Sequence, residues 1–422
     1  MANFNKIPVV LTALIVAGTA AAEVMDRPVG IRIGQRMTLK PYVSISATYD
    51  SNVDSRNDGD DDVVWRINPG LSLEYKAENW VLTANLHYQY NQYSKDHKTG
   101  SNTYNYHGYG EDVSYRWTDS TPGEPGWSLM LSEKYTRINQ IDDIMVEGSN
   151  TGYNRDRDEF NASAALERRF TSQLHANVNT SYYWLDYDSN NDTYSSVYGW
   201  QRWLVGAEAG YALSKWTDLL IAGSYQGYEQ DNTSNSFYSQ YSNKNLSRES
   251  EGYTIQGGIG SYATEKITYR LLGGWSQFKY ADTKAVNGFS YTASANWRIT
   301  DYWNTMLMAS SYYQPSEREY GSATRVDALS WGLSHVMVRG KLSASFDIAY
   351  RRETREYSAV SNYDYDLDIY TCRLGLNYTL NRYLQFFVNA EYQQSIPDGS
   401  SERSDYYDYD RIRGTLGMRF TY

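Results

Sequence analysis

The chain has 422 residues, a formal net charge of −11, a mean hydropathy of −0.67 and a single cysteine, Cys372. The acidic balance excludes a typical nucleic-acid-binding protein, because that class depends on clustered Lys and Arg. After residue 22 the sequence has no run of about 18 apolar residues, which excludes transmembrane helices. A polar chain with 43 tyrosines is still compatible with a membrane β-barrel, in which only alternate residues meet lipid.

Residues 1–22 are predicted to form a secretory signal peptide. Lys6 supplies the positive charge, residues 7–18 are mostly apolar, and Ala20, Ala21 and Ala22 provide a small-residue cleavage site. We therefore expect export through the general secretory route. A short N-terminal segment, residues 23–38, would follow, and residues 39–422 would form one barrel domain.

Segments of alternating apolar and polar residues then follow one another to the end of the chain, as expected for half-buried strands. They cover residues 43–49, 65–75, 80–90, 105–117, 127–137, 159–169, 174–187, 201–213, 216–229, 251–263, 266–280, 288–300, 302–314, 325–337, 341–353, 366–380, 383–394 and 409–422.

The connections between these segments alternate in length. Tight ones lie at 77–79, 171–172, 214–215, 264–265, 301, 339–340 and 381–382, whereas long polar ones include 52–62, 93–103, 139–158, 189–198, 230–248, 357–363 and 397–405. Only 118–126 departs from the short set. Short periplasmic turns and longer extracellular loops are typical of outer-membrane barrels, whereas a soluble sandwich or propeller has no reason to sort its loops. The sequence predicts an all-β fold, a closed antiparallel transmembrane barrel of about 18 strands (16–20).

Aromatic residues gather where the segments end, which is typical of two girdles at the membrane surfaces. Trp80, Trp117, Trp127 and Trp216 lie near short connections, and the pairs Tyr182-Tyr183 and Tyr312-Tyr313 lie toward the long ones. In the last segment Ile412, Leu416, Met418, Phe420 and Tyr422 share one face, and the arginines share the other.

Phasing each segment by its apolar face predicts which polar residues line the lumen. The predicted set is Arg66, Glu74, His87, Arg116, Glu167, Arg202, Glu208, Arg298, Asp347, Arg351, Arg373, Arg411, Arg413 and Arg419. Two interpretations remain open. These charges could pair simply to satisfy one another in a narrow lumen, or they could set the selectivity of an aqueous pore.

The third long connection, 139–158, is a candidate constriction loop, because the third outer loop of general porins folds into the pore. Its charged residues are Asp142, Asp143, Glu147, Arg155 and Arg157. The alternative is an ordinary solvated loop. An acidic tract at 58–62 lacks the pattern of a calcium loop and is also expected to be solvated.

The sequence gives little support for catalysis. The five histidines are scattered, and the chain contains no HExxH, GxSxG or P-loop motif and no Cys/His ligand spacing. We therefore expect no enzymatic activity, no cofactor and no metal.

The run Tyr49-Asp50-Ser51-Asn52-Val53, followed by an acidic loop and by Pro69-Gly70-Leu71-Ser72-Leu73, resembles the opening of the putative β-barrel porin 2 family. Turns such as Leu380-Asn381-Arg382-Tyr383 and the aromatic C-terminus resemble that family too. The resemblance implies an outer-membrane barrel among lipid and lipopolysaccharide. Because some members occur with exopolysaccharide systems, it also implies polysaccharide-export components as partners. Phe420 and Tyr422 resemble the signal read by the barrel-assembly machinery.

These observations lead to two main functional hypotheses. The first is an outer-membrane pore for small polar solutes or saccharides, in passive diffusion or exopolysaccharide export. The second is a barrel with a closed lumen that acts through its loops as an adhesin or structural protein. Fold-level analogy alone cannot decide between them.

Overall fold

The structure is a computed structural model of the chain. It describes residues 30–53, 59–95, 106–120, 124–141, 154–187, 200–214, 216–230, 249–261, 266–280, 285–315, 323–357, 366–398 and 408–422. The predicted signal peptide, residues 1–22, lies outside these ranges. Within them, no helix is long and apolar enough to cross a membrane.

The described residues form nineteen strands. These are β1 (Ile31–Ile33), β2 (Met37–Asp50), β3 (Asp62–Lys76), β4 (Trp80–Tyr93), β5 (Tyr106–Thr118), β6 (Gly126–Ile141), β7 (Asn154–Arg169), β8 (Leu174–Tyr187), β9 (Trp200–Ser214), β10 (Thr217–Gln230), β11 (Glu249–Ser261), β12 (Ile267–Tyr280), β13 (Val286–Arg298), β14 (Trp303–Pro315), β15 (Ala323–Val338), β16 (Leu342–Tyr357), β17 (Asp366–Thr379), β18 (Leu384–Asp398) and β19 (Tyr409–Thr421).

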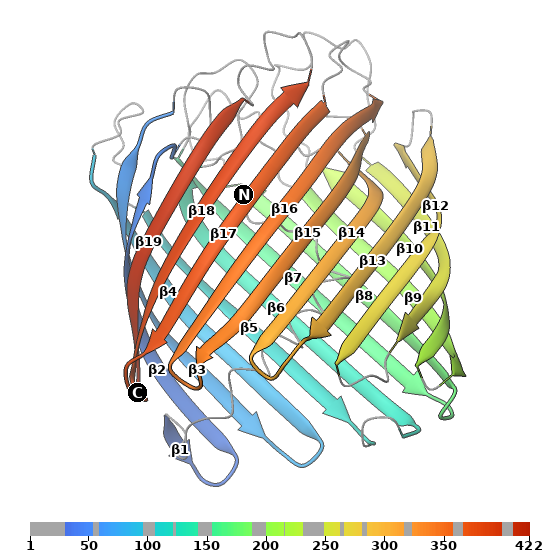
Figure 1. The fold of residues 1–422 in the computed structure, drawn as a ribbon, viewed down its shortest axis with the longest axis horizontal. Helices are drawn as coiled ribbons and strands as arrows, with labels where there is room; N and C mark the ends of the chain where they lie inside the picture. The colour runs from blue at the N-terminus through green and yellow to red at the C-terminus, as the bar shows by residue number, and fades with distance from the viewer. Residues whose placement is uncertain are drawn as a thin grey trace.

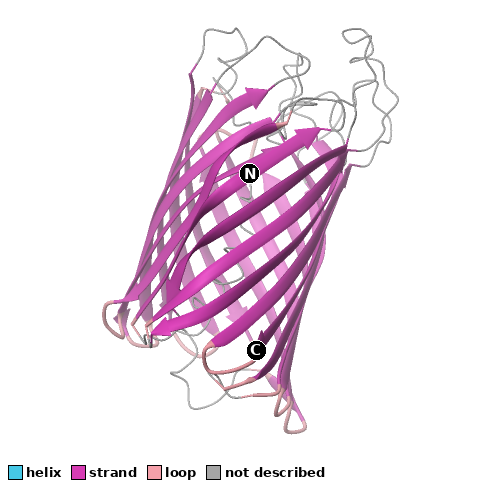
Figure 2. Cartoon of the chain, turned by 90° about the vertical axis from the view of Figure 1, so that its right-hand side faces the viewer, coloured by secondary structure: helices cyan, strands magenta, loops and turns pink. Residues whose placement is uncertain are grey.

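Strands β2 to β19 form a closed antiparallel barrel (Figures 1 and 2). Each pairs with its neighbours in the chain, and β19 pairs with β2 to close the ring. The short strand β1 pairs antiparallel with the start of β2. The eighteen barrel strands match the eighteen predicted segments in order, so the predicted fold class is confirmed.

The largest difference at a strand end concerns β2, which begins at Met37 rather than at residue 43. Lys40 and Pro41 interrupt the apolar alternation there, yet both fit the strand. The Lys40 ammonium faces inward and reaches Glu74 at 3.4 Å, and the Pro41 carbonyl accepts a hydrogen bond from the Tyr422 amide at 2.9 Å. Local alternation therefore underestimated a strand that long-range contacts complete.

Large apolar side chains cover the outside of the barrel. Leu374, Ile412 and Leu416 are all exposed, Leu416 to 63%. Many of the buried residues are instead polar and point inward, such as Asn91, Ser290 and Ser395. This arrangement is the reverse of a soluble sandwich, whose apolar faces meet one another. It suits a wall that faces lipid outside and polar groups inside.

Tight turns connect the strands at one end of the barrel (Figure 2). Their own side chains stabilise them. The Thr171 hydroxyl accepts hydrogen bonds from the amides of Gln173 and Leu174 at 3.1 and 3.0 Å. Thr300 and Asn381 use their side-chain oxygens in the same way. Thr and Asn favour such turns because a short polar side chain can satisfy backbone amides locally.

The wall bends sharply between β9 and β13. Gln256 on β11 reaches across β12 to Ser290 on β13, with Nε2 and Oγ 3.2 Å apart. The bend requires glycine, because a Cβ at Gly274 would lie 2.0 Å from the Ile255 carbonyl oxygen. A Cβ at Gly258 would lie about as close to the Leu271 carbonyl oxygen. We call this sector, from β9 to β13, the glycine corner.

Candidate functional site

The fourteen predicted lumen residues all lie on the inward face of the barrel. In every strand that carries them they alternate with outward apolar residues, as Arg373 does with Leu374 and Arg413 with Ile412. The strand register supports this phase, because inward residues pair with inward residues on both neighbours. The lumen is therefore lined by polar and charged side chains.

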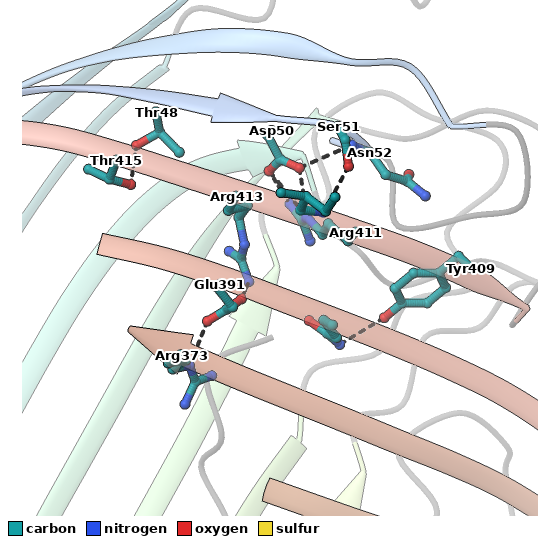
Figure 3. Close-up of polar contacts among 12 residues, drawn as sticks. Thr48, Asp50, Ser51, Asn52, Arg373, Glu391, Tyr409, Arg411, Arg413 and Thr415 are labelled. Carbon is teal, nitrogen blue, oxygen red and sulfur yellow. Dashed lines mark hydrogen bonds and ion pairs between the residues drawn. The ribbon is translucent and has the colours of Figure 1, made fainter. Parts of the chain in front are cut away.

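Arginines concentrate on one arc of this lining, from β16 through β19 and β2 to β3. We call the set Arg66, Arg351, Arg373, Arg411, Arg413 and Arg419 the arginine wall. At its centre, Arg373 and Arg413 bind the two carboxylate oxygens of Glu391 from opposite sides (Figure 3). The Arg373 Nε to Glu391 Oε2 distance is 2.5 Å. The three side chains together carry a net charge of plus one, and Asp347 lies directly opposite Arg373 on the neighbouring strand β16.

Arg411 and Asp50 form a buried ion pair at the seam where β19 meets β2 (Figure 3). Arg411 Nη2 lies 2.7 Å from Asp50 Oδ2, and Nε lies 2.9 Å from Oδ1, so the contact is bidentate. Next to it, the Ile412 amide donates to the Ser51 hydroxyl and the Ser51 amide donates to the Ile412 carbonyl. These contacts hold β19 and β2 together at the end of the barrel opposite the tight turns.

Most of the other predicted charges also have partners. The Glu74 carboxylate lies between Lys40 at 3.4 Å and Lys76 at 2.7 Å. Arg66 Nε donates to the Asn91 amide oxygen at 2.9 Å. Arg351 pairs with Glu353 at 2.7 Å, and Glu208 pairs with Arg270 across the glycine corner.

The remaining members differ in exposure and in position. Arg419 stacks over the Tyr42 ring, with its guanidinium carbon 4.0 Å from the ring centroid. His87 and Arg202 are partly exposed. Exposed side chains are found at Arg116, Glu167 and Arg298, which lie near the tight-turn end, and at Asp347 on β16.

The predicted constriction residues are only partly described. Asp142, Asp143 and Glu147 lie outside the described residues, and of Arg155 only the backbone, at the start of β7, is described. Arg157 faces inward and pairs with Glu159 at 2.7 Å. The constriction role of this connection stays a prediction.

A different segment packs against the inner face of the barrel wall. Residues 311–314 of β14 and 323–326 of β15, which we call the inturned rim, are almost all buried. Pairing of β14 with β13 ends at Ser311, and β14 then contacts β12 and β11 instead. Tyr313, predicted as an outer girdle residue, is instead only 5% exposed and packs with Phe278 and Ala323.

Tyr183 is a second girdle residue that proves to face inward. It stacks near Trp200, with ring centroids 4.6 Å apart, and Trp200 in turn lies 5.3 Å from Tyr228. Its neighbour Tyr182 faces outward as predicted. Adjacent strand residues point to opposite sides, so only one of each Tyr-Tyr pair can belong to a girdle.

Several partners in the lumen were missed by sequence reasoning. Asp50, Arg270 and Glu391 lie on inward positions of strands that the lumen prediction did not cover, where the same two-residue alternation identifies them. Glu353 lies two residues beyond the predicted Arg351 on β16 and continues the same inward series. The contact between Gln226 and Tyr313 joins strands β10 and β14, and no pattern within either strand's sequence predicts it.

Among the described residues, no group of three or more His, Cys, Asp or Glu side chains is placed to hold a metal ion.

Comparison with solved structures places the chain among large barrels. Similar chains include the FrpB iron transporter from Neisseria meningitidis (TM-score 0.50, 12% identity, 91% of this chain and 67% of that one). The siderophore receptor PirA (0.46, 10%, 93% and 81%) and the outer membrane protein OpdK (0.42, 12%, 91% and 99%), both from Pseudomonas aeruginosa, are also similar. At these identities the likeness to FrpB concerns the fold alone.

A comparison with curated proteins finds no match. The sequence does match a family model described as putative beta-barrel porin 2, over residues 26–422. That match covers every strand of the barrel, and the barrel has the outward apolar surface that an outer membrane requires. The chain belongs to the putative β-barrel porin 2 family of outer-membrane barrels.

Proposed function

We propose that the protein is an outer-membrane pore that conducts small polar solutes or saccharides and favours anions. The observation that carries the proposal is the Arg373–Glu391–Arg413 group, where two arginines share one carboxylate on the lumen wall. A ring or row of side-chain charges biases which ions enter a pore. Both arginine side chains keep access to the lumen, with 44% and 31% of their surface exposed.

The size of the barrel supports conduction. An eight-stranded barrel is filled by its own side chains, whereas barrels of sixteen to eighteen strands leave room for an aqueous channel. The family match supports a barrel channel in general. Saccharides as solutes, and a role in exopolysaccharide export, rest on the sequence resemblance and on the polar lining.

A closed barrel that acts through its loops is the second candidate, and the inturned rim favours it. The rim occupies part of the lumen on the side of β10 to β13, and Val326 within it is fully buried. If the rim and the outer connections together fill the lumen, no ions would pass.

Planar-bilayer recording separates the two candidates. We expect stepwise currents from the purified protein and a reversal potential that indicates anion preference in a salt gradient. Replacing both Arg373 and Arg413 by Ser should reduce that preference. Arg382→Ser is the matched control, because Arg382 stacks on Tyr383 in a tight turn outside the lumen. An absence of steps from folded protein would favour the closed barrel.

Liposome swelling tests the saccharide part separately. Neutral sugars and sugar acids of similar size should both enter, the acids faster. Entry of salts without entry of any sugar would remove saccharides from the proposal and keep the pore.

A further inference from the structure

The barrel wall divides in its upper part between β13 and β14. Tyr291 and Ser311 are the last residues that the two strands share. Above that pair, β13 continues along β12 as far as Val286, whereas β14 continues only along β15, as far as Pro315. The two strands therefore take different paths, and β14 carries β15 with it.

The surface that receives the inturned rim is a row of inward residues on four adjacent strands. Gln226 pairs with Gly252, Gly252 with Phe278, and Phe278 with Val286, from β10 to β13. All four belong to the inward phase of their strands. Because Tyr313 contacts members of this row, the rim lies on the lumen side of the wall and not outside it.

Specific contacts hold the rim in place. The Gln226 side-chain amide donates to the Tyr313 carbonyl oxygen at 3.4 Å, across 87 positions of sequence. The Tyr313 ring packs with Phe278, Ala323 and Val286. Gly288 makes room for the ring, since a Cβ there would lie 2.4 Å from the tyrosine oxygen. The apolar packing, the hydrogen bond and the space left by Gly288 all fix the same position of Tyr313.

The rim also has a definite position relative to the charged lining. In a closed ring of eighteen strands, β10 and β19 are nine places apart and so lie on opposite sides. The rim is folded toward the β10 side, and the arginine wall is centred on β17 to β19. The rim and the arginine wall therefore lie on opposite sides of the ring.

We propose that the inturned rim sets the size limit of the pore, and that solutes pass between it and the arginine wall. This inference rests on the proposed function, because a size limit has meaning only if the barrel conducts. It assigns the size limit to residues 311–314 and 323–326 and names Tyr313 and Gln226 as the residues that position them.

The test compares two rim variants of the full-length protein with one control. Tyr313→Ala removes the ring that packs on Phe278, and Gln226→Met removes only the amide that binds the Tyr313 carbonyl. Tyr182→Ala is the matched control, because Tyr182 lies toward the same end but faces outward and binds Gln201. Each is measured by single-channel conductance and by liposome swelling with neutral sugars of increasing size.

Release of the rim should widen the narrowest section. For Tyr313→Ala we expect a conductance increase of roughly twofold, since current through a pore follows its narrowest cross-section, and entry of sugars that the wild type excludes. Gln226→Met should shift both readouts in the same direction, and Tyr182→Ala should leave them at wild-type values. If Tyr313→Ala does not assemble, Gln226→Met decides the question.

Two results would overturn the inference in distinguishable ways. A conducting wild type whose assembled rim variants keep its conductance and sugar limit would refute the role of the rim and leave the proposed pore intact. A folded wild type without any conductance would refute both.

Discussion

Charged residues of the lumen fall into two groups that differ in burial. Asp50 and Arg411 are almost completely buried at the seam, where an ion pair mainly satisfies two charges that water cannot reach. Arg373 and Arg413 are partly exposed and can act on a solute as well as on Glu391. We propose that the two interpretations left open by the sequence apply to different residues of the same lining.

Asp50→Ala should destabilise the barrel strongly. The substitution takes the bidentate carboxylate away from the buried Arg411 guanidinium, and breaking a buried ion pair in this way costs about 3–5 kcal/mol. The free energy of unfolding in urea, measured in lipid vesicles, reports the loss. Asp61→Ala is the control, because its pair with Lys95 is exposed, and exposed pairs add little to stability. Equal effects of the two substitutions would contradict a special role for the seam pair.

At the scale of single residues, the side of the wall was predictable and the partner was not. Two-residue alternation placed Arg373 and Arg413 inward, because strand geometry fixes the direction of every second side chain. Glu391 binds both, but it is 18 positions from one and 22 from the other. Which residues face each other depends on the register between strands, and the sequence pattern of a single strand does not contain it.

Strands and turns are the elements that the sequence predicts best, since both follow from local chemistry. Thr171, Thr300 and Asn381 close their own turns, and apolar alternation marks the strands. The exceptions depend on distant contacts. The start of β2 is completed by Glu74 and Tyr422, and the course of β14 above Ser311 is determined by Gln226 and Phe278.

The last strand offers a test of assembly. Phe420 and Tyr422 are exposed on the outer face, and the Tyr383 ring lies 6.2 Å from each. We propose that the barrel-assembly machinery reads these two aromatics. Tyr422→Ser should then lower the amount of heat-modifiable barrel in the outer membrane several-fold, while Tyr422→Phe retains it.

A control distinguishes recognition from stability in that experiment. Tyr383→Ser removes the ring beside both aromatics but leaves the last strand unchanged. If Tyr383→Ser and Tyr422→Ser lower assembly equally, ring packing explains the effect and recognition by the machinery is not needed.

On the scale of the whole molecule, the outer surface determines where the protein can reside. Large apolar residues are exposed on strand after strand around the ring, with Leu86, Val205, Ile255, Leu329 and Leu416 as examples. A soluble protein rarely exposes an apolar surface so extensive, whereas a barrel in lipid requires it.

Val388 and Asn389 allow this orientation to be tested on neighbouring residues of β18. Val388 faces outward and is 46% exposed, and Asn389 faces inward. Val388→Arg should lower the free energy of unfolding in lipid vesicles by about 2–4 kcal/mol, the cost of an arginine facing the middle of a bilayer. Asn389→Arg, which points into the lumen, should change it much less. The opposite order would mean that the wall is inverted.

The separation of β13 from β14 also limits how deeply the protein can sit in the bilayer. Above the Tyr291–Ser311 pair, the described part of β13 has a strand partner on only one side. Hydrocarbon does not tolerate a free row of peptide groups, since each one would lack a hydrogen bond. In this sector the hydrocarbon layer of the outer leaflet must therefore end at or below the Tyr291–Ser311 pair.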